Sequence, residues 1–211
     1  MIKPVFMGLL SNIAEMLPEV ESILFDYFEI DEVKKTLTTC AISEQVVMLN
    51  DIIKKTRKEN PESIIDLICH SQGTIVAALA NPKGIRKSIL LAPSFDMSLE
   101  RTFKRYDSKT RPGAKIDLDG TSILPELGGL IRIVPAVYWA ERVLIKPFDA
   151  YNTFAENTEM IMIIANQDEI AGKSDPTGLN PKVKQIFLDG NHGFHGNDRE
   201  SLNKIIREII I

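Results

Sequence analysis

Short apolar runs recur along the chain and are separated by polar or turn-forming residues. Each run has the length of a strand, and β-branched or aromatic residues are frequent in them, which favours strands over helices. The pattern predicts a sheet of about six strands from residues 4–9, 22–28, 63–69, 86–93, 159–166 and 183–189.

Helical signals lie between and after these runs. Residues 43–58 place apolar side chains at helical spacing, start at the N-cap residue Ser43 and end in basic residues. Residues 72–80 are mostly small and stop at Asn81-Pro82, and residues 198–210 form the last helix. Strands that alternate with helices predict an α/β fold, with a mostly parallel sheet and helices on both faces.

Residues 95–151 interrupt this alternation. They contain Asp119-Gly120, which predicts a hairpin, and residues 136–145, which predict a helix with the only tryptophan. Because long excursions in compact domains are usually lids or binding elements, we interpret them as a lid inserted into a core of residues 1–94 and 152–211. The basic residues at 101–115 predict either a solvated lid face or attraction of an anionic part of the substrate.

Composition and charge narrow the classes of protein. Of 211 residues, 44% are hydrophobic and 26% are charged, as in ordinary globular proteins. The net charge of −4 gives no electrostatic reason to expect nucleic acid as a partner. Two cysteines are too few for a disulfide framework, and their spacing does not suggest zinc. The chain shows no signal-peptide cleavage site and no apolar run of the ~20 residues that cross a bilayer, so we expect a cytoplasmic protein without a transmembrane segment.

The candidate chemistry lies where the run at 63–69 meets the helix at 72–80. Ser71 stands there between two small residues, Cys69 and Gly73. A sharp turn from a parallel strand into a helix lifts its middle residue above the sheet and tolerates only small neighbours. It also directs the unpaired amides of the helix N-terminus at whatever lies above the serine. Ser71 is therefore a candidate nucleophile, and the amide of Gln72 is a candidate donor to the oxyanion.

The sequence ICHSQGT around Ser71 resembles the nucleophile elbow of the α/β-hydrolase family, and the resemblance extends over the chain apart from the insertion. In that family the serine is followed by an acid and then a histidine. Asp168 follows the run at 159–166, and His192 follows the run at 183–189. The resemblance implies that Ser71 is the nucleophile, that His192 is the general base and that Asp168 orients His192. It also implies a lid after the family's sixth strand and a second oxyanion donor at the amide of Leu9.

The sequence departs from the family's pattern at three places. Cys69 stands where the family usually has glycine, and Met7-Gly8 stands where it has His-Gly. The chain also starts at what would be the family's third strand, so residues 22–28 would form one edge of the sheet. An uncovered apolar edge favours pairing with another chain, which makes a homodimer worth testing.

The implied activity is hydrolysis of a carboxylic ester or thioester of a small to medium acyl substrate through an acyl-enzyme, without a metal or organic cofactor. Asp96 is the alternative acid, and His195 is the alternative histidine. His70 has no role as a base in this pattern. The same residues would also suit an amidase, a carbon–carbon bond hydrolase or an acyltransferase, and the departures leave open a catalytically silent ligand-binding protein.

Overall fold

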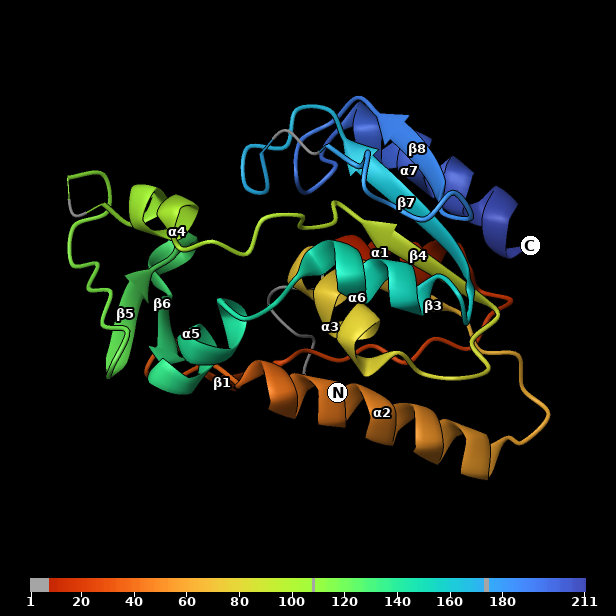
Figure 1. The fold of residues 1–211 in the computed structure, drawn as a ribbon, viewed down its shortest axis with the longest axis horizontal. Coiled ribbons are helices and arrows are strands. Elements are labelled where there is room, and N and C mark those ends of the chain that lie inside the picture. Colours follow the sequence, from red (N-terminus) through yellow and green to blue (C-terminus); the bar gives the residue numbers. More distant parts are fainter. Residues whose placement is uncertain (1–7, 108, 173–174) are drawn as a thin grey trace. The chain divides into compact units, whose positions relative to one another are not determined.

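The computed structural model describes residues 8–107, 109–172 and 175–211 (Figure 1). These residues divide into two compact units. The first unit comprises Ile53–Phe95, Pro147–Ile211 and the described residues up to Asp26, and the second comprises Tyr27–Ile52 and Asp96–Lys146. Helix α2 (Ile42–Glu59) starts in the second unit and ends in the first.

The first unit is built on a parallel sheet with the strand order β3-β4-β7-β8. Its strands are β3 (Leu67–His70), β4 (Lys87–Leu91), β7 (Glu159–Ala165) and β8 (Lys184–Leu188). The helices of this unit are α1 (Gly8–Met16), α3 (Gln72–Ala80), α6 (Pro147–Phe154) and α7 (Asn197–Ile210). Because all four strands run the same way, their carboxyl ends meet at one edge of the sheet.

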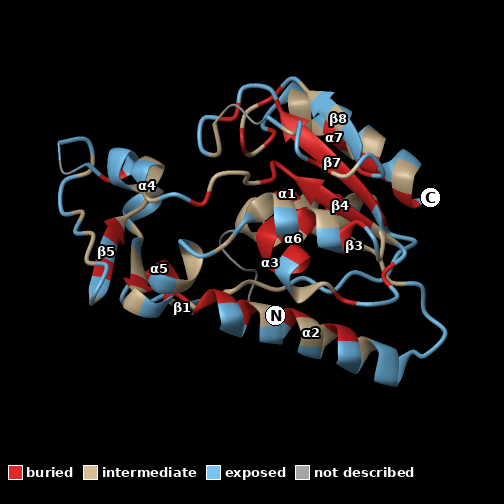
Figure 2. Cartoon of the chain, in the orientation of Figure 1, coloured by how far each residue is buried: buried red, intermediate tan, exposed pale blue. Residues whose placement is uncertain are grey.

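Helices cover both faces of this sheet (Figure 1). Ile89 of β4 and Ile161 of β7 belong to one apolar core with buried residues of α1 and α7. Helices α3 and α6 pack against each other on the opposite face, where Tyr151 and Phe154 of α6 are fully buried. Figure 2 shows β4 and β7 buried along most of their length, as expected for strands between two helical layers.

The second unit contains a mixed sheet with the strand order β1-β2-β6-β5. Strands β2 and β6 are parallel, and the other neighbours are antiparallel. The elements are β1 (Phe28–Asp31), β2 (Thr36–Thr39), α4 (Glu100–Arg105), β5 (Thr121–Pro125), the 3₁₀ turn η1 (Leu127–Gly129), β6 (Ile131–Pro135) and α5 (Ala136–Arg142).

The second unit has its own apolar core and a charged cluster. Trp139 is buried beside Leu124 and Val134, and its Nε1–H donates to Ser122 Oγ at 2.9 Å. The carboxylate of Glu126 accepts from Tyr106 Oη at 2.6 Å and from Arg132 Nε at 2.9 Å. Two basic residues of the stretch 101–115, Arg105 and Arg111, lie 3.6 and 3.9 Å from the same carboxylate.

The α/β class and most of the predicted helices agree with the structure. Helix α3 has the predicted bounds, and an antiparallel bridge joins Lys115 to Ile123 around Asp119-Gly120. The boundaries of the inserted lid stay a prediction. Within the described residues, no helix combines the length and the apolarity needed to span a membrane.

Three predictions about the sheet were wrong in detail. In the described residues the strands form two four-stranded sheets instead of one sheet of about six. Residues 22–26 form no strand, and among the strands that the structure describes β3, not residues 22–28, is an edge of the parallel sheet. The predicted strand at 4–9 lies partly outside the described residues, but Gly8 and Leu9 begin α1. An apolar run is not sufficient for a strand, which also needs a ladder of backbone hydrogen bonds to a neighbouring strand.

Candidate active site

Ser71 lies in a tight turn between β3, which ends at His70, and α3, which begins at Gln72. Its φ of 54° and ψ of −122° are unusual for a residue with a side chain. Such a conformation costs on the order of 1–3 kcal/mol and persists only where the surroundings impose it. Here the Ser71 N–H donates to the carbonyl of Leu91 at 2.9 Å. The Ser71 carbonyl accepts from the N–H and the hydroxyl of Thr74, at 3.0 and 2.6 Å.

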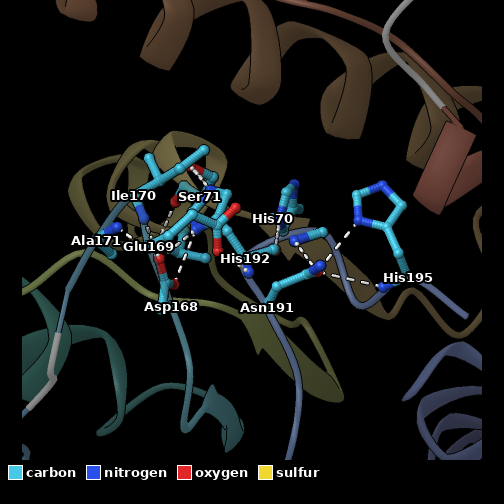
Figure 3. Close-up of polar contacts among 11 residues, drawn as sticks. His70, Ser71, Asp168, Glu169, Ile170, Ala171, Asn191, His192 and His195 are labelled. Carbon is cyan, nitrogen blue, oxygen red and sulfur yellow. Dashed lines mark hydrogen bonds and ion pairs between the residues drawn. The ribbon is translucent and has the colours of Figure 1, made fainter. Parts of the chain in front are cut away.

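The side chains of Ser71, His192 and Asp168 form a continuous chain of hydrogen bonds (Figure 3). His192 Nε2 lies 2.8 Å from Ser71 Oγ, and His192 Nδ1 lies 2.8 and 3.0 Å from the two Asp168 oxygens. Because a carboxylate only accepts, Nδ1 carries the hydrogen, which leaves the lone pair of Nε2 for the serine hydroxyl. This is the tautomer that a general base needs.

Asp168 is held as a carboxylate in a site with little solvent. Its side chain is 2% exposed, and that of His192 is 8% exposed. Burial alone would raise the pKa of Asp168, but hydrogen bonding and attraction to His192 and the backbone amides of Ala171 and Ile170 outweigh burial and lower that pKa. Those two amides donate to Asp168 Oδ1 at 2.6 and 2.9 Å and fix the carboxylate beside the imidazole.

Hydrogen bonds fix the backbone of His192 in addition to its ring. Its N–H donates to Glu169 Oε2 at 3.0 Å, and its carbonyl lies 2.8 Å from His70 Nε2. A carbonyl only accepts, so His70 carries its hydrogen on Nε2. The ring centroids of His70 and His192 lie 4.9 Å apart, and Figure 3 shows both side chains. Burial, and then the nearby His192, lower the pKa of His70 to about 4, so His70 is a neutral donor at ordinary pH.

The alternative histidine, His195, lies elsewhere in the same loop. Asn191 Oδ1 accepts from the amide of Gly193 at 3.1 Å and lies 3.1 Å from Nδ1 of His195. Figure 3 shows His195 on the far side of Asn191 from Ser71. Of the two histidines in this loop, the structure brings His192 to the serine.

Asp96 and Cys69 lie in surroundings that do not suit a triad acid or a nucleophile. Asp96 accepts from the amide of Ser98 at 2.8 Å and lies 3.5 Å from Arg101, whereas Asp168 contacts the imidazole of His192. Burial raises the pKa of the Cys69 thiol to about 12, which argues against a thiolate nucleophile at this turn.

The two predicted oxyanion donors lie in the first turns of helices in the first unit. Gln72 is the first residue of α3, and Leu9 is the second residue of α1. First-turn amides have no acceptor within their own helix and carry partial positive charge, which suits them to an anion. Met7, the other residue at this departure from the family's pattern, lies outside the described residues.

Sequence reasoning missed Glu169 and His70 as partners of the His192 backbone. Neither contact leaves a spacing signal, because each is made to the main chain across more than twenty positions of sequence. In the described part of the chain, no three His, Cys, Asp or Glu side chains are grouped as metal ligands would be.

Neither a protein-family model nor a curated protein sequence matches this chain, whereas solved structures do. Est1E from Butyrivibrio proteoclasticus superposes with a TM-score of 0.61 at 14% identity, covering 100% of this chain and 85% of that one. An esterase from Pyrococcus furiosus superposes with a TM-score of 0.56 at 17% identity, over 82% of this chain and 62% of that one.

The esterase domain of a Rhodothermus marinus protein gives a TM-score of 0.53 at 14% identity over 74% of this chain. The match spans 64% of that domain's length. The chain thus shares the fold of these esterases, which is the α/β-hydrolase fold that the sequence around Ser71 predicts.

Proposed function

We propose that this protein is a serine hydrolase that cleaves a carboxylic ester or thioester of a small to medium acyl group through an acyl-enzyme. The hydrogen-bonded chain from Ser71 through His192 to Asp168 carries the proposal. The esterases that share the fold support the ester class of substrate. The proposed reaction belongs to the ester hydrolases, EC 3.1.

In the first half of the reaction, Ser71 Oγ attacks the acyl carbon while Nε2 of His192 takes the hydroxyl proton. Asp168 stabilises the imidazolium that forms. The negative charge moves to the former carbonyl oxygen, where the amides of Gln72 and Leu9 are the proposed donors. The intermediate then collapses, and His192 gives its proton to the departing alkoxide or thiolate.

In the second half, water replaces the leaving group. His192 removes a proton from that water as it attacks the acyl-enzyme, and a second tetrahedral intermediate forms at the same carbon. Its collapse breaks the bond to Ser71 Oγ, which regains the proton from His192, and the carboxylic acid is released. We assign the choice of acyl group to the proposed lid at residues 95–151.

The deciding experiment is intact mass after incubation with a fluorophosphonate. The proteins compared are wild type, Ser71→Ala and a control, Ser63→Ala, which removes an exposed hydroxyl in the same unit. We expect one adduct on wild type and on the control, and none on folded Ser71→Ala. With an activated ester, Ser71→Ala should lose kcat by up to about 10⁶-fold, as nucleophile removal does in a serine protease.

The outcomes of this experiment separate the two classes of function. A folded wild-type protein that takes no adduct and cleaves no ester would contradict the proposal and favour a ligand-binding protein. An adduct that persists on Ser71→Ala would show that another residue is the activated nucleophile.

A further inference from the structure

Helices α1 and α7 of the first unit are joined by a row of polar contacts. The donors on α7 and the acceptors on α1 each recur every four residues, so the two helices run parallel and in register. The contacts are Arg199 Nη1 to the Gly8 carbonyl at 3.4 Å, Asn203 Nδ2 to Asn12 Oδ1 at 2.9 Å and Arg207 Nη1 to the Met16 carbonyl at 3.1 Å.

Arg199 makes more contacts than the other two donors. Its Nε donates to the carbonyl of Phe194 at 2.9 Å, and its Nη2 donates to the carbonyl of Gly193 at 2.8 Å. Gly193 and Phe194 directly follow His192, and the Phe194 side chain is fully buried in the core beside α1 and α7. One guanidinium therefore bridges the loop that carries His192 and the first residue of α1.

The contact with Gly8 has a consequence at Leu9. The Gly8 carbonyl and the Leu9 N–H belong to the same planar peptide unit, so a donor that orients the oxygen also orients the N–H on the opposite side. A charged donor on the carbonyl further polarises the N–H of that unit. The amide of Leu9 is the second proposed oxyanion donor, so Arg199 lies one peptide bond from the proposed oxyanion hole.

The position of Arg199 is unfavourable for helix stability. It lies in the first turn of α7, where the helix dipole disfavours a cation. Burial also lowers the pKa of Arg199, which shows that its surroundings disfavour the charge. An arginine is expected at such a position only where specific contacts offset the unfavourable electrostatics. Here the guanidinium of Arg199 donates to three backbone carbonyls.

We propose that Arg199 is a positioning residue that fixes the His192 loop relative to the Gly8–Leu9 peptide, so that the general base and one oxyanion donor keep a constant spacing. The inference rests on the proposed function, because it concerns the same acyl transfer. Arg199 does not contact the reacting atoms. It acts through two backbone segments whose misplacement by about 1 Å would lower turnover.

Arg207 supplies a matched control for this proposal. It also donates to a carbonyl of α1, and it pairs with Glu19 at 3.0 Å, but it lies two helical turns beyond Arg199. Arg199→Gln should lower kcat by about tenfold to hundredfold with little change in KM, less than the loss of an oxyanion donor itself. Arg207→Gln should keep kcat within about twofold. Arg199→Lys should recover only part of the rate, because a single ammonium cannot reproduce the planar fork.

A second measurement separates positioning from a merely structural role. A trifluoromethyl ketone traps the serine as a hemiketal: Ser71 Oγ bonds to the carbonyl carbon, its proton passes to His192, and the oxygen becomes an oxyanion. The inhibition constant should therefore rise for Arg199→Gln by the factor by which kcat/KM falls, whereas that of Arg207→Gln stays at the wild-type value. Thermal unfolding of both variants reports any general loss of structure, and Arg199→Lys serves for the comparison if the Gln variant does not fold.

The failure of this inference differs from the failure of the proposed function. Wild-type protein that reacts with the fluorophosphonate, together with unchanged kcat and ketone inhibition in folded Arg199→Gln, overturns the positioning role alone. Equal losses in Arg199→Gln and Arg207→Gln also overturn it, because they would reflect helix packing. A wild-type protein that takes no label overturns the proposed function and this inference with it.

Discussion

The two units each contain a four-stranded sheet, and the strands bury their side chains in different patterns. In β7 of the first unit, every residue after Glu159 is buried. In β5 of the second unit, exposed Thr121 and Ile123 alternate with buried Ser122 and Leu124. Helices cover the parallel sheet on both faces, whereas alternation in β5 indicates a strand with one covered face.

The two units also differ in the surroundings of their charged side chains. The first unit holds His70, Asp168 and His192 at the carboxyl ends of its strands, with each side chain oriented by directed hydrogen bonds. The second unit surrounds one carboxylate, Glu126, with arginines. A buried carboxylate next to an imidazole orients that imidazole for proton transfer, whereas a carboxylate among arginines links segments of the chain through ion pairs. Substitutions of these charged groups should therefore change activity in the first unit and mainly stability in the second.

Among the charged groups compared above, the largest effect is expected at Asp168. Asp168→Asn can donate its amide to Nδ1 of His192, which stabilises the wrong tautomer and leaves Nε2 protonated towards Ser71. We expect kcat to fall by up to ~10⁴-fold, as for the equivalent change in a serine protease. Steady-state kinetics with an activated ester, normalised by active-site titration, measure this loss.

Two controls accompany Asp168→Asn. Glu169→Gln keeps an acceptor for the His192 N–H and should stay within about tenfold of wild type, since neutral acceptors form weaker bonds than carboxylates. Glu126→Gln, in the second unit, should also retain turnover. Near wild-type activity in Asp168→Asn would mean that the acid is misassigned, and Asp96 would be the next residue to test.

A smaller effect is expected from shortening one apolar side chain in each of the two sheets. Ile163 of β7 is fully buried, whereas Ile123 of β5 is 40% exposed. Ile163→Ala should lower the free energy of unfolding by about 2–5 kcal/mol, because it removes buried methylenes and leaves a cavity. Ile123→Ala should cost about 1 kcal/mol or less, as exposed substitutions do.

Urea denaturation followed by circular dichroism measures the free energy of unfolding of both isoleucine variants. The comparison requires that this free energy falls with urea concentration at the same slope in both variants. Equal losses would show that β5 is covered on both faces, and the contrast between the sheets would not hold.

The sequence predicted the first unit better than the second. Continuous apolar runs mark β4 and β7 because both faces of those strands are buried, and Asn81 ends α3 in a left-handed conformation before Pro82. The resemblance to the α/β-hydrolase family, which rests on the order of serine, acid and histidine, implied that Ser71, Asp168 and His192 would meet. Ends of parallel strands share one edge, so residues after those strands converge whatever their separation in sequence.

The second unit was harder to predict because its pairing is not local. Strand β2 has the polar sequence TLTT and is paired with β6, whose residues come almost a hundred positions later. Strand β1, FEID, is likewise polar, whereas the more apolar residues before it form no strand. Strand propensity depends on which side chains lie opposite, and periodicity alone does not contain that information. Contacts to backbone atoms, such as those of Arg199 and His70, are equally invisible in a pattern of side chains.

The smallest expected effect concerns His70, the neutral imidazole beside the triad of the first unit. Its folded pKa of about 4 lies below the ordinary histidine value of 6.5, since burial and the nearby His192 and Arg199 outweigh the opposing effects of the His192 carbonyl and Asp168. Between those values the unfolded chain binds more protons, so stability falls as the pH is lowered through this window. His70→Gln retains an N–H donor and does not titrate.

From pH 7 to pH 5, wild type should therefore lose about 2 kcal/mol more unfolding free energy than His70→Gln does, as measured by urea denaturation at each pH. Between pH 7 and pH 8 the two proteins should change nearly in parallel, because the imidazole is then neutral in the folded state and mostly neutral in the unfolded state. The lowered pKa of Asp168 acts only below this range and does not obscure the difference. Identical losses at pH 5 would mean that the fold does not hold His70 as a neutral donor. The contrast with the permanently charged arginine cluster of the second unit would then lose its basis.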